Sequence, residues 1–257
     1  MPEPRRPGSL VEGLGAWLAV APLPYDTYGL DPAALVTYTA RSAEAACRAP
    51  DVMQCRAQRG PAEALTVFQP LAWDSEMLGV AAGRLSLVAL NPGARALPDR
   101  GAGVLREAIR GALDAADGCG VKHLSVRVDA RDTVVTQALE AEGFQIVDGI
   151  LKFGIDLETG ILPPHQGEVR DAREEDIPAL RDLAARGFVY DRFHNDPEIT
   201  RDTADALHAA WVENAVHGKT GCGVITAEVD GEPAGFFILG EDGLAQEVPG
   251  TGWEPWC

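Results

Sequence analysis

The sequence predicts a mixed α/β protein made of two units, each with a central mixed sheet flanked by helices. Residues 62–157 show strand-type and helix-type patterns in the order strand, loop, helix, strand, helix, strand. Residues 167–240 show the order strand, helix, helix, β-hairpin. Between them, residues 158–166 contain Gly160, Pro163 and Pro164, which is typical of an interdomain linker.

Composition excludes several kinds of partner. The chain of 257 residues has 39 acidic and 22 basic side chains and a formal net charge of −17. Such a surface repels phosphates, so we expect no nucleic-acid partner and no anionic membrane partner. No stretch is apolar enough to span a bilayer, and Glu12 with interspersed Gly and Pro argues against an export signal, so we expect a cytoplasmic protein. The five cysteines are scattered, so we expect neither a disulfide framework nor a metal site.

Residues 1–61 form an N-terminal extension to which no role is assigned. Residues 1–29 are rich in Pro and Gly and predict an irregular lead-in. Asp31 and Pro32 form a good helix start, and residues 33–48 are expected to be helical. Residues 49–61 are broken and polar.

The first unit, residues 62–157, is expected to begin with a strand at 65–68. A second strand lies towards Leu90, and residues 91–99 form a Pro/Gly loop. Apolar residues at helical spacing predict a helix around 104–113, followed by a strand at 123–128 and a helix at 132–142. Residues 145–156 are expected to supply a closing strand.

The second unit, residues 167–243, opens with a short strand at 168–170. An acidic run and Pro178 then start a helix whose apolar residues include Ile177 and Leu180. A second helix covers 200–217. Asp230 and Gly231 suit a tight two-residue turn between apolar strands, which predicts a hairpin over 224–239.

These segments carry a resemblance to the Gcn5-related N-acetyltransferase (GNAT) superfamily. RDAREEDIPALRDLA and VDGEPAGF resemble the usual start of a GNAT domain. YDRFHNDPEIT is similar to the SRFHxDP segment of the TDP-fucosamine acetyltransferase subgroup, and Trp73–Gly79 resembles its WDSxFFG segment. The resemblance implies tandem GNAT-like units, the first degenerate and the second incomplete, because residues 244–257 lack the expected second half.

The resemblance also implies acetyl-CoA or another acyl-CoA as co-substrate. A GNAT domain holds the pyrophosphate in a Gln/Arg-x-x-Gly-x-Gly/Ala loop at a helix start. Here Arg100, Gly101, Ala102 and Gly103 match part of that pattern and are the candidate cofactor-binding residues. Leu105 replaces the last small residue, and Leu139 stands where the family has a Tyr that protonates the departing thiolate. A helix entry kept from an ancestral cofactor site is the other interpretation of this segment.

The resemblance places the acceptor next to the segment between the two helices of the second unit. It makes His194 and Tyr190 the catalytic candidates. The candidate substrate-binding residues are Trp73, Asp74, Arg192, Phe193 and Asp196. The alternative is structural: Trp73 as a core anchor, Phe193 packing, His194 bonding locally, and Asp196 capping a turn. His208 is expected to be a surface or structural residue.

The implied function is acyl-CoA-dependent N-acyl transfer to a small amine, such as an amino sugar or a natural-product precursor. The alternatives are a catalytically inactive GNAT-like partner protein, a truncated product, or other thioester chemistry such as decarboxylation. Because the last strand of the hairpin is expected to be an open edge, a homo-oligomer or a partner chain could complete the second sheet.

Overall fold

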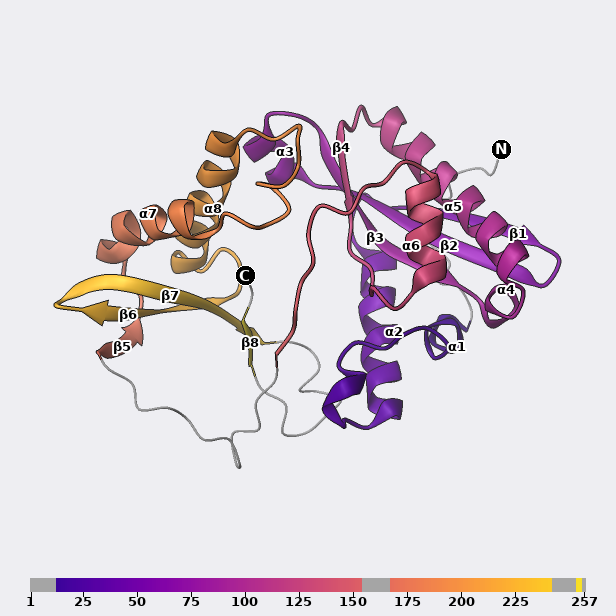
Figure 1. The fold of residues 1–257 in the computed structure, drawn as a ribbon, viewed down its shortest axis with the longest axis horizontal. Coiled ribbons are helices and arrows are strands. Elements are labelled where there is room, and N and C mark those ends of the chain that lie inside the picture. Colours follow the sequence, from indigo (N-terminus) through magenta and orange to yellow (C-terminus); the bar gives the residue numbers. More distant parts are fainter. Residues whose placement is uncertain (1–12, 154–166, 242–252, 256–257) are drawn as a thin grey trace. The chain divides into compact units, whose positions relative to one another are not determined.

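The computed structural model describes residues 13–153, 167–241 and 253–255 (Figure 1). The chain divides into two compact units, Met1–Gln145 and Ile146–Cys257. Each unit contains helices and a four-stranded sheet, which confirms the expected mixed α/β class. Within the described ranges, no helix is both long and apolar enough to cross a membrane. The expected linker at 158–166 lies outside the described residues.

The first unit is built on a sheet in the order β1-β2-β3-β4. The β1–β2 and β2–β3 pairs are antiparallel, whereas β3 and β4 are parallel and are joined through the long helix α5. Its elements in chain order are α1 (Leu14–Leu18), the 3₁₀ turn η1 (Asp26–Tyr28), α2 (Pro32–Arg48), β1 (Met53–Arg59), β2 (Ala62–Pro70), α3 (Ala72–Leu78), β3 (Ala82–Leu90), α4 (Pro92–Arg95), α5 (Pro98–Gly118), β4 (His123–Val126) and α6 (Thr133–Ala141).

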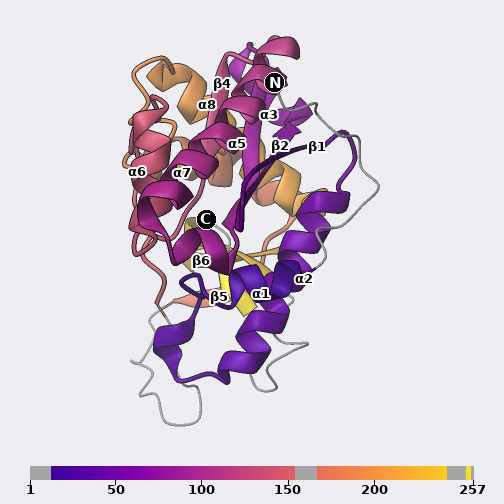
Figure 2. The same ribbon diagram turned by 90° about the vertical axis from the view of Figure 1, so that its right-hand side faces the viewer.

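Helices cover both faces of this sheet. Figures 1 and 2 show α5 and α6 on one side and α1 and α2 on the other. β2 is buried on both faces: Phe68 packs in the core under α5, and Leu65 and Val67 pack in the core under α1 and α2. Burying strands on both faces requires near-continuous apolar residues, and β2 meets that requirement.

Asn91 fixes the end of β3. Its Oδ1 accepts hydrogen bonds from the backbone N–H of Ala94 at 2.7 Å and of Glu63 at 3.0 Å, and its Nδ2 donates to the carbonyl of Pro61 at 2.9 Å. One side chain therefore caps α4 and ties it to the β1–β2 turn. This sets the position of Arg95 at the other end of α4.

The second unit is an antiparallel sheet in the order β5-β6-β7-β8, with two helices packed on one face. Leu180, Val212 and Ile238 lie in its core, which joins both helices to the hairpin. The opposite face is more open, and Val169 and Phe237 are more than half exposed. Its elements are β5 (Glu168–Asp171), η2 (Glu174–Asp176), α7 (Ile177–Gly187), α8 (Arg201–Val216), β6 (Gly223–Val229), β7 (Glu232–Glu241) and β8 (Trp253–Pro255).

Five expectations about elements need correction. Residues 92–95 form helix α4 and α5 begins at Pro98, although residues 91–99 were expected to be a loop. Residues 14–18 are helical, with Leu14 and Trp17 buried, although the lead-in was expected to be irregular. Residues 53–59 form strand β1, although the segment reads as broken and polar. Residues 145–153 contain no strand. Trp253–Pro255 pairs with β7, so that edge is not open there, although residues 244–257 were expected to lack strands.

Candidate functional site

A cleft opens in the first unit where β3 and β4 separate. The two strands pair only from Ala82 opposite His123 to Leu85 opposite Val126, although β3 continues to Leu90. Beyond that point a cavity of about 160 Å³ lies beside β3. It is lined by Trp17, Leu18, Ala21, Pro22, Ser86, Leu87, Val88, Ala89, Leu90, Arg95, Arg127, Val128, Asp129, Asp132 and Val135.

Charged side chains form one wall of the cleft. Arg95 on α4 makes two hydrogen bonds to Asp132, at 3.1 and 2.6 Å, and both side chains are largely buried. The Nε of Arg95 is buried and has no hydrogen-bond partner in the described part of the chain. Arg127, just after β4, also lines the cleft. This wall therefore carries a buried ion pair with one unused donor and a second guanidinium.

The N-terminal extension also lines the cleft, through Trp17, Leu18, Ala21 and Pro22. Arg131 holds this segment in place: it donates to both oxygens of Asp26 at 2.8 Å, to the carbonyl of Leu23 at 3.1 Å and to Asp129 at 2.7 and 2.9 Å. The hydrogen bonds from Arg131 lower the pKa of Asp129. The extension is thus part of the cleft.

The predicted cofactor residues lie in a helix and not in a loop. Arg100, Gly101, Ala102 and Gly103 fall within the first two turns of α5. The N–H of Gly101 donates to the carbonyl of Leu97 at 2.7 Å, and a Cβ on Gly101 would lie 2.4 Å from the carbonyl oxygen of Ala94. Close packing of α5 on α4 therefore explains this glycine. A Cβ on Gly103 would meet open space.

Trp73 and Asp74 both lie on the short helix α3 and are partly buried. Neither is among the residues that line the cleft. The neighbouring Ser75 has the clear structural role, because its Oγ accepts from the N–H of Ala82 at 2.8 Å and donates to the carbonyl of Leu71 at 2.6 Å. Leu105 and Leu139 are buried in the core under α5 and α6.

The other predicted residues lie in the segment between α7 and α8. Tyr190 is 86% exposed. The guanidinium of Arg192 lies 4.2 Å from the ring centre of Phe193, and Phe193 is buried. Asp196 accepts from the N–H of Glu198 at 3.0 Å, as a turn residue does.

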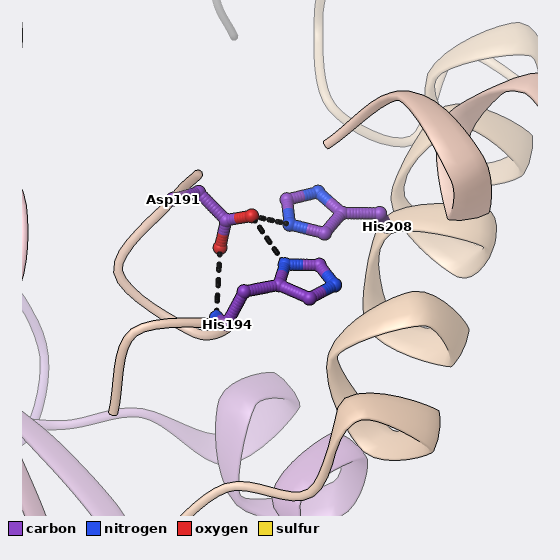
Figure 3. A group of neighbouring side chains, drawn as sticks. All are labelled: Asp191, His194 and His208. Carbon is purple, nitrogen blue, oxygen red and sulfur yellow. Dashed lines mark hydrogen bonds and ion pairs between the residues drawn. The ribbon is translucent and has the colours of Figure 1, made fainter. Parts of the chain in front are cut away.

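His194 belongs to a cluster that includes two residues the sequence did not single out as site residues, Asp191 and His208 (Figure 3). Oδ2 of Asp191 lies 2.5 Å from Nδ1 of His194 and 3.1 Å from Nε2 of His208. On the far side of its ring, Nε2 of His194 lies 2.9 Å from Oδ1 of Asp205 on α8. His208 packs against Phe188, with ring centres 4.7 Å apart.

The two imidazoles of this cluster have opposite acid–base behaviour. Burial lowers the pKa of His194, but hydrogen bonds to Asp205 and Asp191 outweigh burial and raise it. For His208, burial is the largest influence and lowers the pKa, although Asp191 opposes it. Burial also acts on Asp191, yet hydrogen bonds from His194 and from the N–H of Phe193 lower its pKa.

Sequence signals for Asp191 and His208 were weak. Asp191 directly precedes the predicted Arg192–His194 run, and His208 lies on the buried side of α8 between Leu207 and Ala209. A histidine among buried helix positions is the signal that could have pointed to His208. The cleft had no compact signal, because its walls come from segments near residues 17–22, 86–95 and 127–135.

Comparison with known proteins gives two sequence relatives. One segment is 31% identical over 121 residues to a dTDP-fucosamine acetyltransferase of Escherichia coli O6:H1, covering 46% of this chain and 51% of that protein. A segment of 113 residues is 25% identical to the spore coat polysaccharide biosynthesis protein SpsD of Bacillus subtilis, covering 44% of this chain and 39% of that protein. The matched segments thus span about half or less of each relative's length. No family model matches the chain.

Solved structures give weaker likenesses. A transcriptional regulator from Bacillus halodurans aligns with 60% of this chain and all of its own, at a TM-score of 0.38 and 17% identity. An aminoglycoside 6'-N-acetyltransferase from Acinetobacter haemolyticus aligns with 60% of this chain and 97% of its own, at a TM-score of 0.34 and 14% identity.

Proposed function

Since the chain belongs to the Gcn5-related N-acetyltransferase superfamily, we propose that it is an acyl-CoA-dependent N-acyltransferase acting on a small amine. The observation that carries the proposal is the cleft beside β3, where pairing with β4 stops at Leu85. An acyl-CoA needs a narrow slot with backbone donors on one side and cations near its phosphates. The cleft has an unpaired edge of β3 on one side, and Arg95 and Arg127 are among its lining residues.

The open edge of β3 suits the acyl arm. β3 pairs with β2 along its length, from Gly83 opposite Pro70 to Leu90 opposite Ala64, whereas its other edge loses its partner after Leu85. Backbone N–H groups on that edge are available to bind the pantetheine amides and to polarise the thioester carbonyl. Fixed donors aimed at a developing oxyanion are an effective source of rate enhancement.

The charged wall suits the phosphates. Arg95 has a buried, unused Nε beside the cleft, and Arg127 adds a second guanidinium. Arginine binds phosphate oxygens well because its donors are planar and permanently charged. These two residues join Arg100 and Gly103 as candidates for cofactor contact. Gly101 and Ala102 remain candidates from the sequence, although the Gly101 amide is used within α5.

For the acceptor we propose an amino sugar, because one relative's name specifies a fucosamine acetyltransferase. By this mechanism the amine nitrogen attacks the thioester carbonyl and gives its proton to a base, and the tetrahedral oxyanion accepts hydrogen bonds from the backbone N–H groups. The C–S bond then breaks, and an acid returns a proton to the departing CoA thiolate. Trp73, Asp74, Arg192, Phe193 and Asp196 remain the candidate acceptor contacts, and Tyr190 and His194 the candidates for proton transfer. Other thioester chemistry stays the alternative reaction for the same cleft, such as decarboxylation of an acyl-CoA whose acyl chain carries a free carboxylate.

One observation favours a second candidate, a catalytically inactive acyl-CoA-binding or partner protein. Leu139, which stands where the family's proton-donating Tyr is expected, is 4% exposed and packed in the core. A leucine there cannot protonate a thiolate. An enzyme would need another proton donor, whereas a binding protein would not.

The test is isothermal titration of the full chain with acetyl-CoA and with CoA. We expect micromolar binding, roughly −8 kcal/mol. Arg127→Gln should weaken it about tenfold, because one charged contact to phosphate is lost. Arg84→Gln is the matched control: Arg84 is an exposed arginine on β3 that does not line the cleft, and its loss should leave the affinity unchanged.

Product analysis then separates the candidates. The protein is incubated with acetyl-CoA and a panel of sugar nucleotides bearing free amines. We expect free CoA thiol and an N-acetylated product, which mass spectrometry detects. Binding without turnover on any amine would favour the inactive protein. The absence of binding at millimolar acetyl-CoA would overturn the enzyme and the acyl-CoA-binding protein, and would leave the partner protein.

A further inference from the structure

We propose that Asp191, His194 and His208 form a binding site for one divalent transition-metal ion, with Zn²⁺ the ion that fits best. Each residue offers one ligand atom, and the three atoms lie within 4.8 Å of one another. Two imidazoles and one carboxylate form a common protein ligand set for zinc, leaving a fourth position for solvent. This site lies in the second unit and is independent of the acyl-CoA cleft.

The spacing of the atoms is close to what the ion needs. In a tetrahedral zinc site with bonds of about 2.0 Å, neighbouring ligand atoms are about 3.3 Å apart. Oδ2 of Asp191 is already 3.1 Å from Nε2 of His208. Its distance of 2.5 Å to Nδ1 of His194 is that of a hydrogen bond and must open by roughly 0.8 Å. Asp191 lies in a non-helical segment, where a shift of that size is easily accommodated.

Outer contacts already point the ligand atoms inward. Asp205 faces Nε2 of His194 at 2.9 Å, which leaves Nδ1 for the ion. The backbone N–H of Phe193 donates to Oδ1 of Asp191 at 2.8 Å, which leaves Oδ2 for the ion. Metal-binding histidines usually donate their second N–H to a carboxylate or carbonyl in this way.

His208 is buried beside the carboxylate of Asp191. It is 4% exposed, its Nε2 lies 3.1 Å from Oδ2 of Asp191, and its Nδ1 has no hydrogen-bond partner among the described residues. Oδ2 of Asp191 thus faces a nitrogen of each imidazole, so the carboxylate and both rings converge (Figure 3). An ion between the three residues replaces the contact between Nε2 and Asp191 with a metal bond to each. Phe188 and Phe193 pack around the ring and shield it from water.

Metal binding would give His194 a different role from the one inferred from the sequence. A metal-bound His194 is a ligand that ties the segment between α7 and α8 to α8, and not a proton-transfer group. Without an ion, the same geometry is a hydrogen-bonded cluster in which a protonated His194 donates one N–H to Asp191 and the other to Asp205. Direct metal binding distinguishes the two.

The experiment uses the full chain, stripped of metal with a chelator and titrated calorimetrically with Zn²⁺. Co²⁺ is added in a parallel titration as an optical probe of ligand type. We expect one Zn²⁺ per chain and a visible Co²⁺ spectrum typical of nitrogen and oxygen ligands. His208→Gln and Asp191→Asn should weaken binding by roughly 100-fold or more, and Asp205→Asn, which keeps all three ligands, by about 10- to 100-fold.

His217→Gln is the matched control. His217 also lies near carboxylates, 4.0 Å from Glu174 and 3.9 Å from Glu213, but it lies at the end of α8 outside the cluster. The His217→Gln variant should leave zinc affinity unchanged. Circular dichroism checks that each variant is folded; should His208→Gln unfold, the comparison of Asp205→Asn with the unaltered chain still decides.

Three results would overturn the proposal. The first is a chain that binds no Zn²⁺, which leaves the hydrogen-bonded cluster as the full account. The second is binding that His217→Gln weakens as much as Asp205→Asn does, which indicates adventitious surface binding. The third is a Co²⁺ spectrum with a thiolate charge-transfer band, which assigns the ion to cysteine.

Discussion

Arg170 shows how single residues hold the second unit together. From β5 it donates to both oxygens of Asp176 at 2.7 and 2.9 Å and, through Nε, to Glu228 of β6 at 2.9 Å. Asp176 also accepts from the N–H of Arg173 at 2.7 Å. Hydrogen bonds from Arg170, acting against burial, lower the pKa of Asp176 to about 2. This carboxylate links β5 and β6 to the start of α7 only while it is ionised.

The stability of the second unit should therefore fall in acid. Because the folded pKa of Asp176 is depressed, its contribution is present above the unfolded pKa of about 3.9 and is lost as pH falls towards about 2. Asp176→Asn should lower stability at neutral pH by on the order of 2 kcal/mol and flatten the acid slope. Thermal unfolding across that pH range measures both effects. Asp171→Asn, an exposed position on β5, is the control, and parallel acid slopes for Asp176→Asn and the unaltered chain would contradict the prediction.

At the scale of an element, helix α5 contains two glycines with different surroundings, which the sequence alone could not distinguish. Gly101 lies against α4, whereas Gly103 faces open space. Gly101→Ala should destabilise the protein by about 1–3 kcal/mol because its Cβ overlaps the carbonyl oxygen of Ala94. Gly103→Ala should stabilise it by about 0.5–1 kcal/mol because alanine favours helix. Urea unfolding measures both changes.

The same pair reports on the acyl-CoA proposal. If Gly103 allows phosphate to approach the helix, Gly103→Ala will weaken acetyl-CoA binding while raising stability. Unchanged affinity would move the phosphate contacts to Arg95 and Arg127. An equal loss of stability in both variants would contradict the packing difference between the two positions.

Elements with local signals were predicted well, and elements that depend on distant pairing were not. α2 begins after Asp31, which caps it through the N–H groups of Ala33 and Ala34. The turn of the hairpin has positive φ at Asp230 and Gly231, as its sequence predicts. β1 was missed because polar residues such as Gln54 are buried within it, and β8 was missed because three residues carry no periodicity. Strand pairing supplies what the local pattern lacks.

For the whole molecule, separate cores predict separate unfolding. The first unit has two apolar clusters, one on each face of its sheet, and the second unit has its own cluster around Leu180 and Val212. We expect two transitions in differential scanning calorimetry of the full chain. Gly101→Ala should shift only one of them and Asp176→Asn only the other. A single transition that both variants shift equally would contradict this.

The candidate sites differ in how far the sequence alone could reveal them. His194 was visible in the sequence because the YDRFHNDPEIT segment is compact. Its partner His208 lies in the next helix, α8, and a single histidine in a helix forms no motif with a defined residue spacing. The cleft joins residues more than a hundred positions apart, such as Trp17 and Asp132, so only the folded sheet brings them together.

The position of Trp17 has a practical consequence. Trp17 is 7% exposed and lines the cleft. Tryptophan emission changes in intensity and wavelength with the groups that contact the ring. A molecule that enters the cleft must approach Trp17, so the chain carries its own fluorescent reporter of occupancy, and ligands can be screened by emission without any label.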